Sequence, residues 1–191
     1  MRRRSLAAVA LVSIAWLSSR TAAAQESSSR PAASGTVVRG LAGGGASVAT
    51  LFGISSTALH LDAGVGIQKE RSFFPLTVNA ELGQTPNGLS AGEITVGAGT
   101  QWVIGRARLG AGLDLGYGWI GRAPTSIGPH IGMYALDAFA LATLDVIDLG
   151  DHRALYLGVR PSVGLRWGEG LFAWSHGAVT WRGAALAGIR F

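Results

Sequence analysis

The chain has 191 residues, with no Cys, 29 Gly, 48% hydrophobic residues and 14% charged residues. This length suits a single domain, and the absence of Cys excludes a disulfide framework and a thiolate metal site. The formal net charge is +5, but four of the 16 basic residues lie within the first 20 positions. Without those four, 12 basic residues face 11 acidic ones, a net charge of about +1. Such a nearly neutral chain gives no reason to expect nucleic acid as a partner.

The first 24 residues have the pattern of an export signal. Arginines at positions 2–4 supply a positive start, residues 6–17 form an apolar run too short for a stop-transfer helix, and residues 22–24 are a small-residue cleavage site. We therefore predict a cleaved signal peptide over residues 1–24. Residues 25–34 are rich in Ser and Ala and predict a short flexible leader. The barrel domain described next is predicted over residues 35–191.

Apolar and polar residues alternate through most of the remaining chain. In residues 57–67, Leu59 and Leu61 share one face while His60 and Asp62 share the other, which is the period of a β-strand. The same alternation marks residues 76–82, 93–104, 108–119, 155–166 and 179–191, and two less regular segments lie at 36–44 and 134–146. The pattern predicts about eight strands of roughly 9–13 residues, the length that a tilted strand needs to cross a membrane.

The connections between these segments differ in length. Short connections at 68–72, 105–106 and 147–153 interleave with longer ones at 47–56, 84–91, 120–132 and 167–177. Short turns at one rim and longer loops at the other are typical of an up-and-down antiparallel barrel.

The charges of the alternating segments lie opposite the bulky apolar side chains. They are Asp62, Glu81, Glu93, Arg108, Asp114, Asp137, Asp145, Arg160, Arg166, Arg182 and Arg190. A membrane barrel would place the apolar face against lipid and pair these acids and arginines inside, and we favour it because charge is tolerated there when partnered. A soluble barrel that carries an apolar ligand is the alternative, with the apolar face turned into a narrow lumen. Because eight strands leave an interior that side chains just fill, we predict that the inward charges close the lumen.

Aromatic residues fall near both predicted rims. Phe73, Phe74, Trp102 and Phe191 lie near the rim with the short turns, and Tyr117, Trp119 and Trp181 lie near the other. Amphipathic rings gather at headgroup level in membrane barrels, so the placement predicts two aromatic girdles.

The export signal, the alternating strands and a final strand that ends in Ile189, Arg190 and Phe191 resemble those of bacterial outer-membrane β-barrels. At the level of pattern the resemblance covers nearly the whole mature chain, and the small eight-stranded barrels of the outer-membrane protein A and X types are the most similar. It implies an all-β, eight-stranded, antiparallel up-and-down transmembrane β-barrel in the outer membrane of a Gram-negative cell. It also implies outer-membrane lipid and the barrel-assembly machinery as partners, with Phe191 as the signal that this machinery reads.

One residue departs from this pattern. Pro161 lies inside a predicted strand, where it removes a donor of the hydrogen-bond ladder. A β-bulge or a misplaced strand boundary would account for it.

Catalytic residues are weakly indicated. Candidate Ser, His and acid groups occur as Ser175, His176 and Glu169, as Ser126 and His130, and as His60 and Asp62. Nucleophilic catalysis requires a base within reach of the hydroxyl, whereas adjacent Ser and His in a strand point in different directions. The sequence at 176–178 also lacks the His, Ser and Asn pattern of lipid A deacylases. We therefore predict no enzymatic activity, with a lipid A-modifying enzyme as the alternative.

No cofactor or metal is predicted either, because the four His residues show no ligand spacing. The longer loops carry apolar residues instead. They are Leu51, Phe52 and Ile54 in the first loop and Leu171, Phe172 and Trp174 in the last. These patches suit contact with lipid, with a partner protein of unknown identity or with another barrel, which predicts a structural or surface-interaction role.

Overall fold

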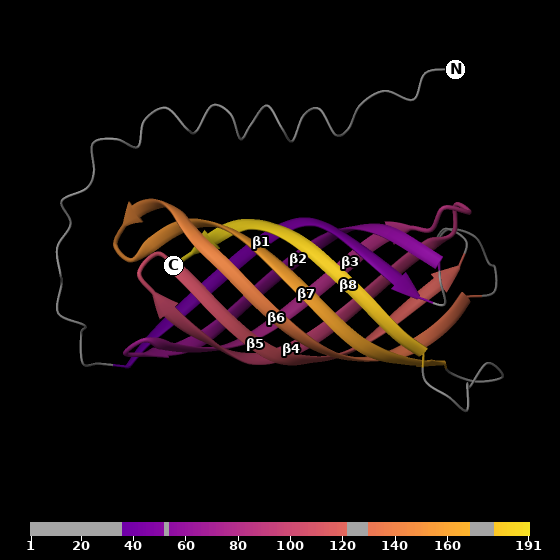
Figure 1. Ribbon diagram of the computed structural model, residues 1–191, viewed down its shortest axis with the longest axis horizontal. Helices are drawn as coiled ribbons and strands as arrows, with labels where there is room; N and C mark the ends of the chain where they lie inside the picture. Colours follow the sequence, from indigo (N-terminus) through magenta and orange to yellow (C-terminus); the bar gives the residue numbers. More distant parts are fainter. Residues whose placement is uncertain (1–35, 52–53, 122–129, 169–177) are drawn as a thin grey trace, which may run out of the picture. The chain divides into compact units, whose positions relative to one another are not determined.

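The computed structural model describes residues 36–51, 54–121, 130–168 and 178–191 (Figure 1). They form eight strands: β1 (Thr36–Leu51), β2 (Ile54–Lys69), β3 (Ser72–Gln84), β4 (Ser90–Ile104), β5 (Ala107–Gly121), β6 (His130–Gly150), β7 (Arg153–Gly168) and β8 (Ala178–Arg190). Each strand pairs antiparallel with the next, and β8 pairs with β1, so the sheet closes into a barrel. The predicted fold, an eight-stranded antiparallel up-and-down barrel, is confirmed. No helix in the described ranges is long and apolar enough to span a bilayer. The predictions for residues 1–34 lie outside the described residues.

The barrel has two different ends. At one end, here called the turn end, two-residue turns at 70–71, 105–106 and 151–152 join β2 to β3, β4 to β5 and β6 to β7 (Figure 1, left). The first residues of these turns are Glu70, Gly105 and Asp151. Positive φ angles of 53°, 62° and 49° at these three residues make the reversals possible. The opposite end, here called the loop end, carries the connections between the remaining consecutive strands.

The strands are longer than predicted. They span 13 to 21 residues, and the first predicted loop, 47–56, is largely strand, because β1 and β2 remain paired up to Leu51 and Ile54. Strand pairing is a backbone property, so it continues through polar rim residues such as Ser47 and Ser55 where the apolar alternation ends. Periodicity alone marks only the part of each strand that has an apolar face.

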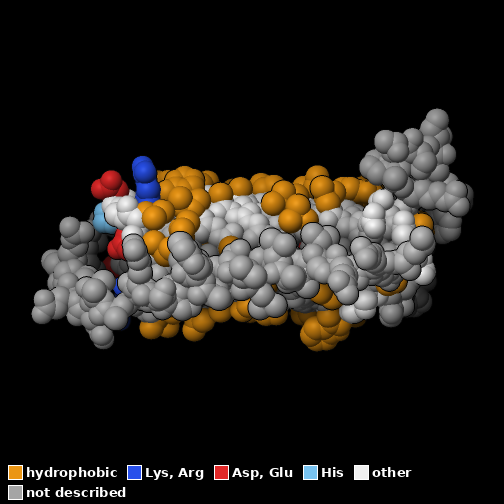
Figure 2. Space-filling view, turned by 90° about the horizontal axis from the view of Figure 1, so that it is seen from above, with side chains coloured by type: hydrophobic (Ala, Val, Ile, Leu, Met, Phe, Trp, Pro, Cys, Tyr) orange, Lys and Arg blue, Asp and Glu red, His pale blue; other side chains and the backbone are white. Residues whose placement is uncertain are grey.

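The alternation of the strands separates an apolar wall from a polar interior. Large apolar side chains are exposed on all eight strands, with Val38 at 68%, Trp181 at 65% and Leu115 at 61%. Between the two rims, the outward positions of the described strands carry no charge. Figure 2 shows apolar side chains along the visible wall and charged ones gathered at the turn end. The interior instead holds the buried charges, together with a small apolar cluster of Tyr156, Ala184 and Leu186.

Neither explanation offered above for Pro161 is correct, because this residue causes no bulge and lies well inside β7. It faces outward opposite Gly183 of β8. On its other side, pairing stops after Phe139 and Ser162 and resumes at Ala142 and Val159 in the same register. The barrel therefore tolerates the missing donor as a short gap in one ladder. The register shifts of this hairpin lie elsewhere, next to the turn end, between Asp145 and Gly150.

Candidate functional site

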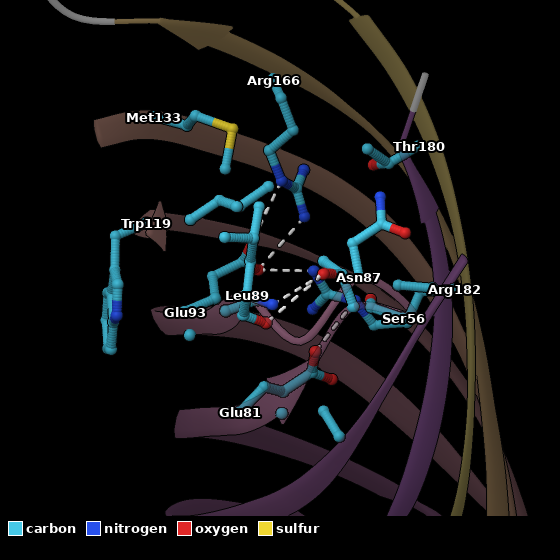
Figure 3. Close-up of a pocket in the computed structure, with 17 residues that line it drawn as sticks. Ser56, Glu81, Asn87, Leu89, Glu93, Trp119, Met133, Arg166, Thr180 and Arg182 are labelled. Atoms are coloured by element: carbon cyan, nitrogen blue, oxygen red, sulfur yellow. Dashed lines mark hydrogen bonds and ion pairs between the residues drawn. The ribbon is translucent and has the colours of Figure 1, made fainter. Parts of the chain in front are cut away.

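The lumen near the loop end is filled by a group of charged side chains, here called the mouth cluster: His60, Glu81, Glu93, Asp137, Arg166 and Arg182. Six different strands contribute one residue each. Figure 3 shows Arg166 and Arg182, from the neighbouring strands β7 and β8, turned toward Glu93 of β4. All six side chains are at most 12% exposed.

Arg166 is the best-satisfied member of the mouth cluster. Its Nε and Nη2 donate to the two carboxylate oxygens of Glu93 at 2.9 and 3.1 Å, and its Nη1 and Nη2 donate to those of Asp137 at 2.8 Å each. The guanidinium is thus held by two bidentate pairs, the strongest form of charged hydrogen bond between side chains. Because the side chain is only 2% exposed, these pairs replace its hydration.

Arg182 and His60 complete the mouth cluster. Arg182 Nη2 donates to Glu93 Oε1 at 2.7 Å, and its Nε lies 3.3 Å from Glu81 Oε2. His60 Nδ1 lies 2.9 Å from Glu81 Oε1, while its Nε2 is buried without a hydrogen-bond partner. Two guanidiniums therefore face three carboxylates, and His60 binds the one carboxylate that Arg166 does not contact.

A second group of contacts lies in the middle of the lumen. Arg160 Nη2 donates to Asp114 Oδ2 at 2.5 Å and its Nη1 to Asn79 Oδ1 at 2.7 Å. The guanidinium carbon lies 3.9 Å from the centroid of the Phe139 ring, a cation–π contact. Asn79 in turn donates to Thr95 Oγ1 at 3.1 Å. These contacts connect β7, which carries Arg160, with β3, β4, β5 and β6.

The third group lies toward the turn end. Tyr156 donates its hydroxyl to Asp62 Oδ2 at 3.2 Å. Arg190 pairs with Asp145, which also faces Arg108 Nη2 at 3.7 Å. A single carboxylate thus serves two arginines at this end of the lumen.

Glycines make room for the buried carboxylates. A Cβ on Gly97 would collide with the carboxylate of Asp114, and one on Gly164 would collide with that of Asp137. Each pair faces across neighbouring strands, Gly97 opposite Asp114 and Gly164 opposite Asp137. The many inward glycines of the sequence are therefore part of how an eight-stranded lumen holds five arginines.

Three separate cavities lie along the lumen among the described residues. The mouth cavity, of about 130 Å³, lies above the mouth cluster and is lined by Ser56, Glu81, Leu89, Trp119, Met133 and Arg182 among others (Figure 3). A cavity of about 20 Å³ lies between Asp62, Tyr156 and Arg160, and one of about 240 Å³ lies at the turn end. The middle cavity is about large enough for one water molecule.

The structure places all eleven predicted interior charges in the lumen, where each takes part in a hydrogen bond or ion pair. Three other lumen residues, Asn79, Phe139 and Tyr156, belong to the same contacts and were not among those predicted. Their strand parity already put them on the charged face, which was the signal available.

One predicted girdle residue is misplaced. Phe73 is fully buried and points into the lumen, whereas its neighbour Phe74 is 52% exposed on the wall. The even-numbered residues of β3 face outward, so Phe73 must face inward, where its ring packs over Gly66. Of the other predicted girdle residues, Trp102 and Phe191 are exposed on the wall near the turn end, and Tyr117 and Trp181 near the loop end. Trp119, also near the loop end, is half-buried and lines the mouth cavity.

Few of the possible catalytic and loop residues are described. Residues 52, 126, 169, 171, 172 and 174–176 and the side chains at 51, 54 and 130 lie outside the described set. His60 and Asp62 are described, and they bind different partners, Glu81 and Tyr156. In the described ranges, no group of three or more His, Asp or Glu side chains is arranged to hold a metal ion.

The architecture defines a class: a closed eight-stranded up-and-down barrel with an apolar wall and a charged, largely filled lumen. A solved structure with the same fold is that of Neisserial surface protein A, which superposes with a TM-score of 0.54 and 13% sequence identity over 82% of this chain and 97% of that one. At this identity the likeness concerns the fold alone. Comparison with family models and with curated proteins gave no match.

Proposed function

We propose that this protein is an integral outer-membrane β-barrel whose lumen is closed by ion pairs and which acts structurally or through its loop-end surface. The observation that carries this proposal is the charge-free apolar wall around a lumen whose mouth and middle hold paired charges. Lipid covers such a wall, whereas the largest apolar patch of a typical soluble monomer is only ~300–600 Å².

The direction in which the apolar side chains face also favours a membrane barrel over a soluble carrier of an apolar ligand. A carrier would need its apolar residues inside the barrel, yet Leu59, Leu113 and Val159 are 54%, 58% and 55% exposed on the wall. The aromatic residues at both rims of the wall add support, because they match the two interfaces of a bilayer. We place the turn end in the periplasm and the loop end at the cell surface, the usual arrangement of short turns and longer loops.

The contacts in the middle of the lumen support a closed lumen. An ion moving between the mouth cavity and the turn-end cavity would have to pass Arg160, Asp114 and Phe139, which are in mutual contact or share hydrogen-bond partners. The space left between the two larger cavities is about 20 Å³. We therefore propose a non-conducting barrel without enzymatic activity, in which the loops provide the contacts to lipid or protein partners.

Phe191 fits a role in assembly by the barrel-assembly machinery. It closes the barrel seam, because its backbone N and O bond to Gly40 O and N of β1 at 3.0 and 2.6 Å. Its ring covers Gly40, where a Cβ would collide with it, and remains 53% exposed. A terminal ring on the wall is accessible to a factor that recognises the last strand.

The test is expression of the full chain in a Gram-negative host, followed by fractionation and by gel electrophoresis of boiled and unboiled samples. The proposal predicts a heat-modifiable band in the outer-membrane fraction, because a closed barrel resists detergent. A soluble protein without the shift would contradict it. Lipid A from the same cells should be unchanged in mass, and a changed lipid A would favour the enzyme instead.

The surface role is tested on the apolar loop residues. Replacing Leu171, Phe172 and Trp174 with Ser should leave the heat-modifiable band intact and weaken chemical cross-linking of the protein to its neighbours in whole cells. Unchanged cross-linking would argue against this loop as the contact site.

A further inference from the structure

More cationic than anionic side chains line the turn-end cavity. Four arginines, Arg39, Arg106, Arg108 and Arg153, and two carboxylates, Asp145 and Asp148, line its 240 Å³. No ion pair joins Arg39, Arg106 or Arg153 to a carboxylate in the described ranges. This contrasts with the mouth cluster, where carboxylates outnumber guanidiniums.

Each of the two carboxylates already binds another group of the protein. Asp145 pairs with Arg190, so its 3.7 Å contact to Arg108 is shared. Asp148 accepts the backbone N–H of Gly150 at 2.9 Å, an arrangement that stabilises the β6–β7 turn. Neither carboxylate is paired with Arg39, Arg106 or Arg153.

Arg108 is the most poorly satisfied of these cations. Its side chain is 11% exposed, and its Nε and Nη1 are buried without a hydrogen-bond partner. Buried donors of a charged group that lack partners are costly, since their hydration is lost without replacement. Arg39 and Arg190 lie close enough to repel it further.

The backbone holds this arrangement in place. The N–H of Asp145 donates to the carbonyl of Arg106 at 2.8 Å, which ties the β4–β5 turn to β6. Arg106 and Asp145 are thus fixed side by side, with Arg39 entering from β1 and Arg153 from β7. Cations converge on one space from four parts of the barrel.

We propose that the turn-end cavity is a binding site for a phosphate group, coordinated by Arg39, Arg106 and Arg108. Guanidinium groups bind phosphate oxygens by paired hydrogen bonds. The cavity volume is many times the ~10–15 Å³ that one water molecule needs, so a tetrahedral oxyanion fits with part of its hydration shell. The phosphate comes from solution or from a phospholipid headgroup at the rim, where Phe74 and Trp102 mark the end of the apolar wall.

The first experiment measures binding of inorganic phosphate by calorimetry to the full chain folded in a non-ionic, phosphate-free detergent. The second reconstitutes the chain in phosphatidylcholine nanodiscs with and without phosphatidylglycerol and counts retained phosphatidylglycerol by native mass spectrometry. Binding in the first experiment identifies free phosphate as a ligand, and retention in the second identifies a lipid headgroup. The site does not depend on the proposed outer-membrane location, so these results and the fractionation experiment can fail separately.

The variant to compare with wild type is Arg39→Gln with Arg106→Gln, which removes two unpaired cations. Arg71→Gln is the matched control, because Arg71 lies in another turn at the same end, outside the cavity, and is likewise tied to a neighbouring strand through its carbonyl. The double variant should lose at least tenfold in phosphate affinity or release the bound lipid, and R71Q should lose less than twofold. Heat-modifiable migration confirms folding of each variant, and Arg106→Gln alone replaces the double variant where that fails to fold.

Three results would overturn the proposal. The first is absence of both phosphate binding and lipid retention in wild type. The second is an equal loss in R71Q, because that would indicate general attraction to a basic rim. The third is displacement of phosphate by an equal concentration of chloride, because a site built from paired hydrogen bonds distinguishes a tetrahedral oxyanion from a halide.

Discussion

Replacing Arg166 with Gln should be among the most destabilising single changes in the lumen. Arg166 makes four hydrogen bonds to Glu93 and Asp137 at 2.8–3.1 Å and is 2% exposed. Without it, Arg182 alone faces three carboxylates, including Glu81. Breaking a buried ion pair from one side costs about 3–5 kcal/mol of unfolding free energy. For a urea dependence of about 2 kcal/mol/M, the unfolding midpoint falls by roughly 1.5–2.5 M.

The assay is urea unfolding of the folded chain in lipid vesicles, followed by tryptophan fluorescence and by gel mobility. Arg71→Gln is the control, because a surface substitution changes the free energy by less than about 0.5 kcal/mol. The triple variant Arg166→Gln, Glu93→Gln and Asp137→Asn separates charge from packing, since it removes the stranded carboxylates together with their cation. It should recover at least half of the loss. An R166Q midpoint near that of wild type, or a triple variant no more stable than R166Q, would refute the reasoning.

The other predictions concern the wall, the glycines and the middle of the lumen. Leu113→Arg, on the 58% exposed wall of β5, should lower the free energy of unfolding in vesicles by about 2–4 kcal/mol, measured against Leu113→Ala. Gly164→Ala should cost about 1–3 kcal/mol in the same assay through collision with Asp137. Gly183→Ala should be nearly neutral, because nothing lies within 4 Å of its added Cβ. Arg160→Ala should give discrete conductance steps in a planar bilayer where wild type gives none, and equal conductance in both proteins would argue that Arg160 does not close the lumen.

The architecture could be predicted from the sequence because side chains alternate along a strand. Whether a residue holds an odd or an even position, its parity, therefore decides whether its side chain faces lipid or lumen. Parity also identifies the inward charges, since Asp114 and Arg160 lie opposite apolar residues in their own strands. Phe73 shows what happens when parity is set aside. Two adjacent aromatic residues were assigned to one girdle, although neighbouring residues in a strand must face opposite ways.

The partners of the charges could not be predicted from individual strands. Arg166 of β7 bonds to Asp137 of the adjacent β6 and to Glu93 of β4, across the lumen. Such contacts depend on the stagger between strands and on the diameter of the closed barrel, neither of which is encoded in the periodicity of one strand. The strand ends were missed for a related reason, since main-chain pairing at the rims leaves no apolar pattern.

The balance of charge differs between the two ends of the lumen, and we infer a different role for each end. At the loop end, carboxylates exceed guanidiniums, and hydrogen bonds and ion pairs link six strands into one cluster. At the turn end, guanidiniums exceed carboxylates, and several donors lack a partner. Because a buried charge is stabilising only where its hydrogen bonds are satisfied, Arg166 with its four hydrogen bonds suits the mouth cluster to hold the barrel closed. The unsatisfied donors of the turn end are instead suited to bind an external anion. That anion would accept their hydrogen bonds, as Glu93 and Asp137 accept those of Arg166 within the chain.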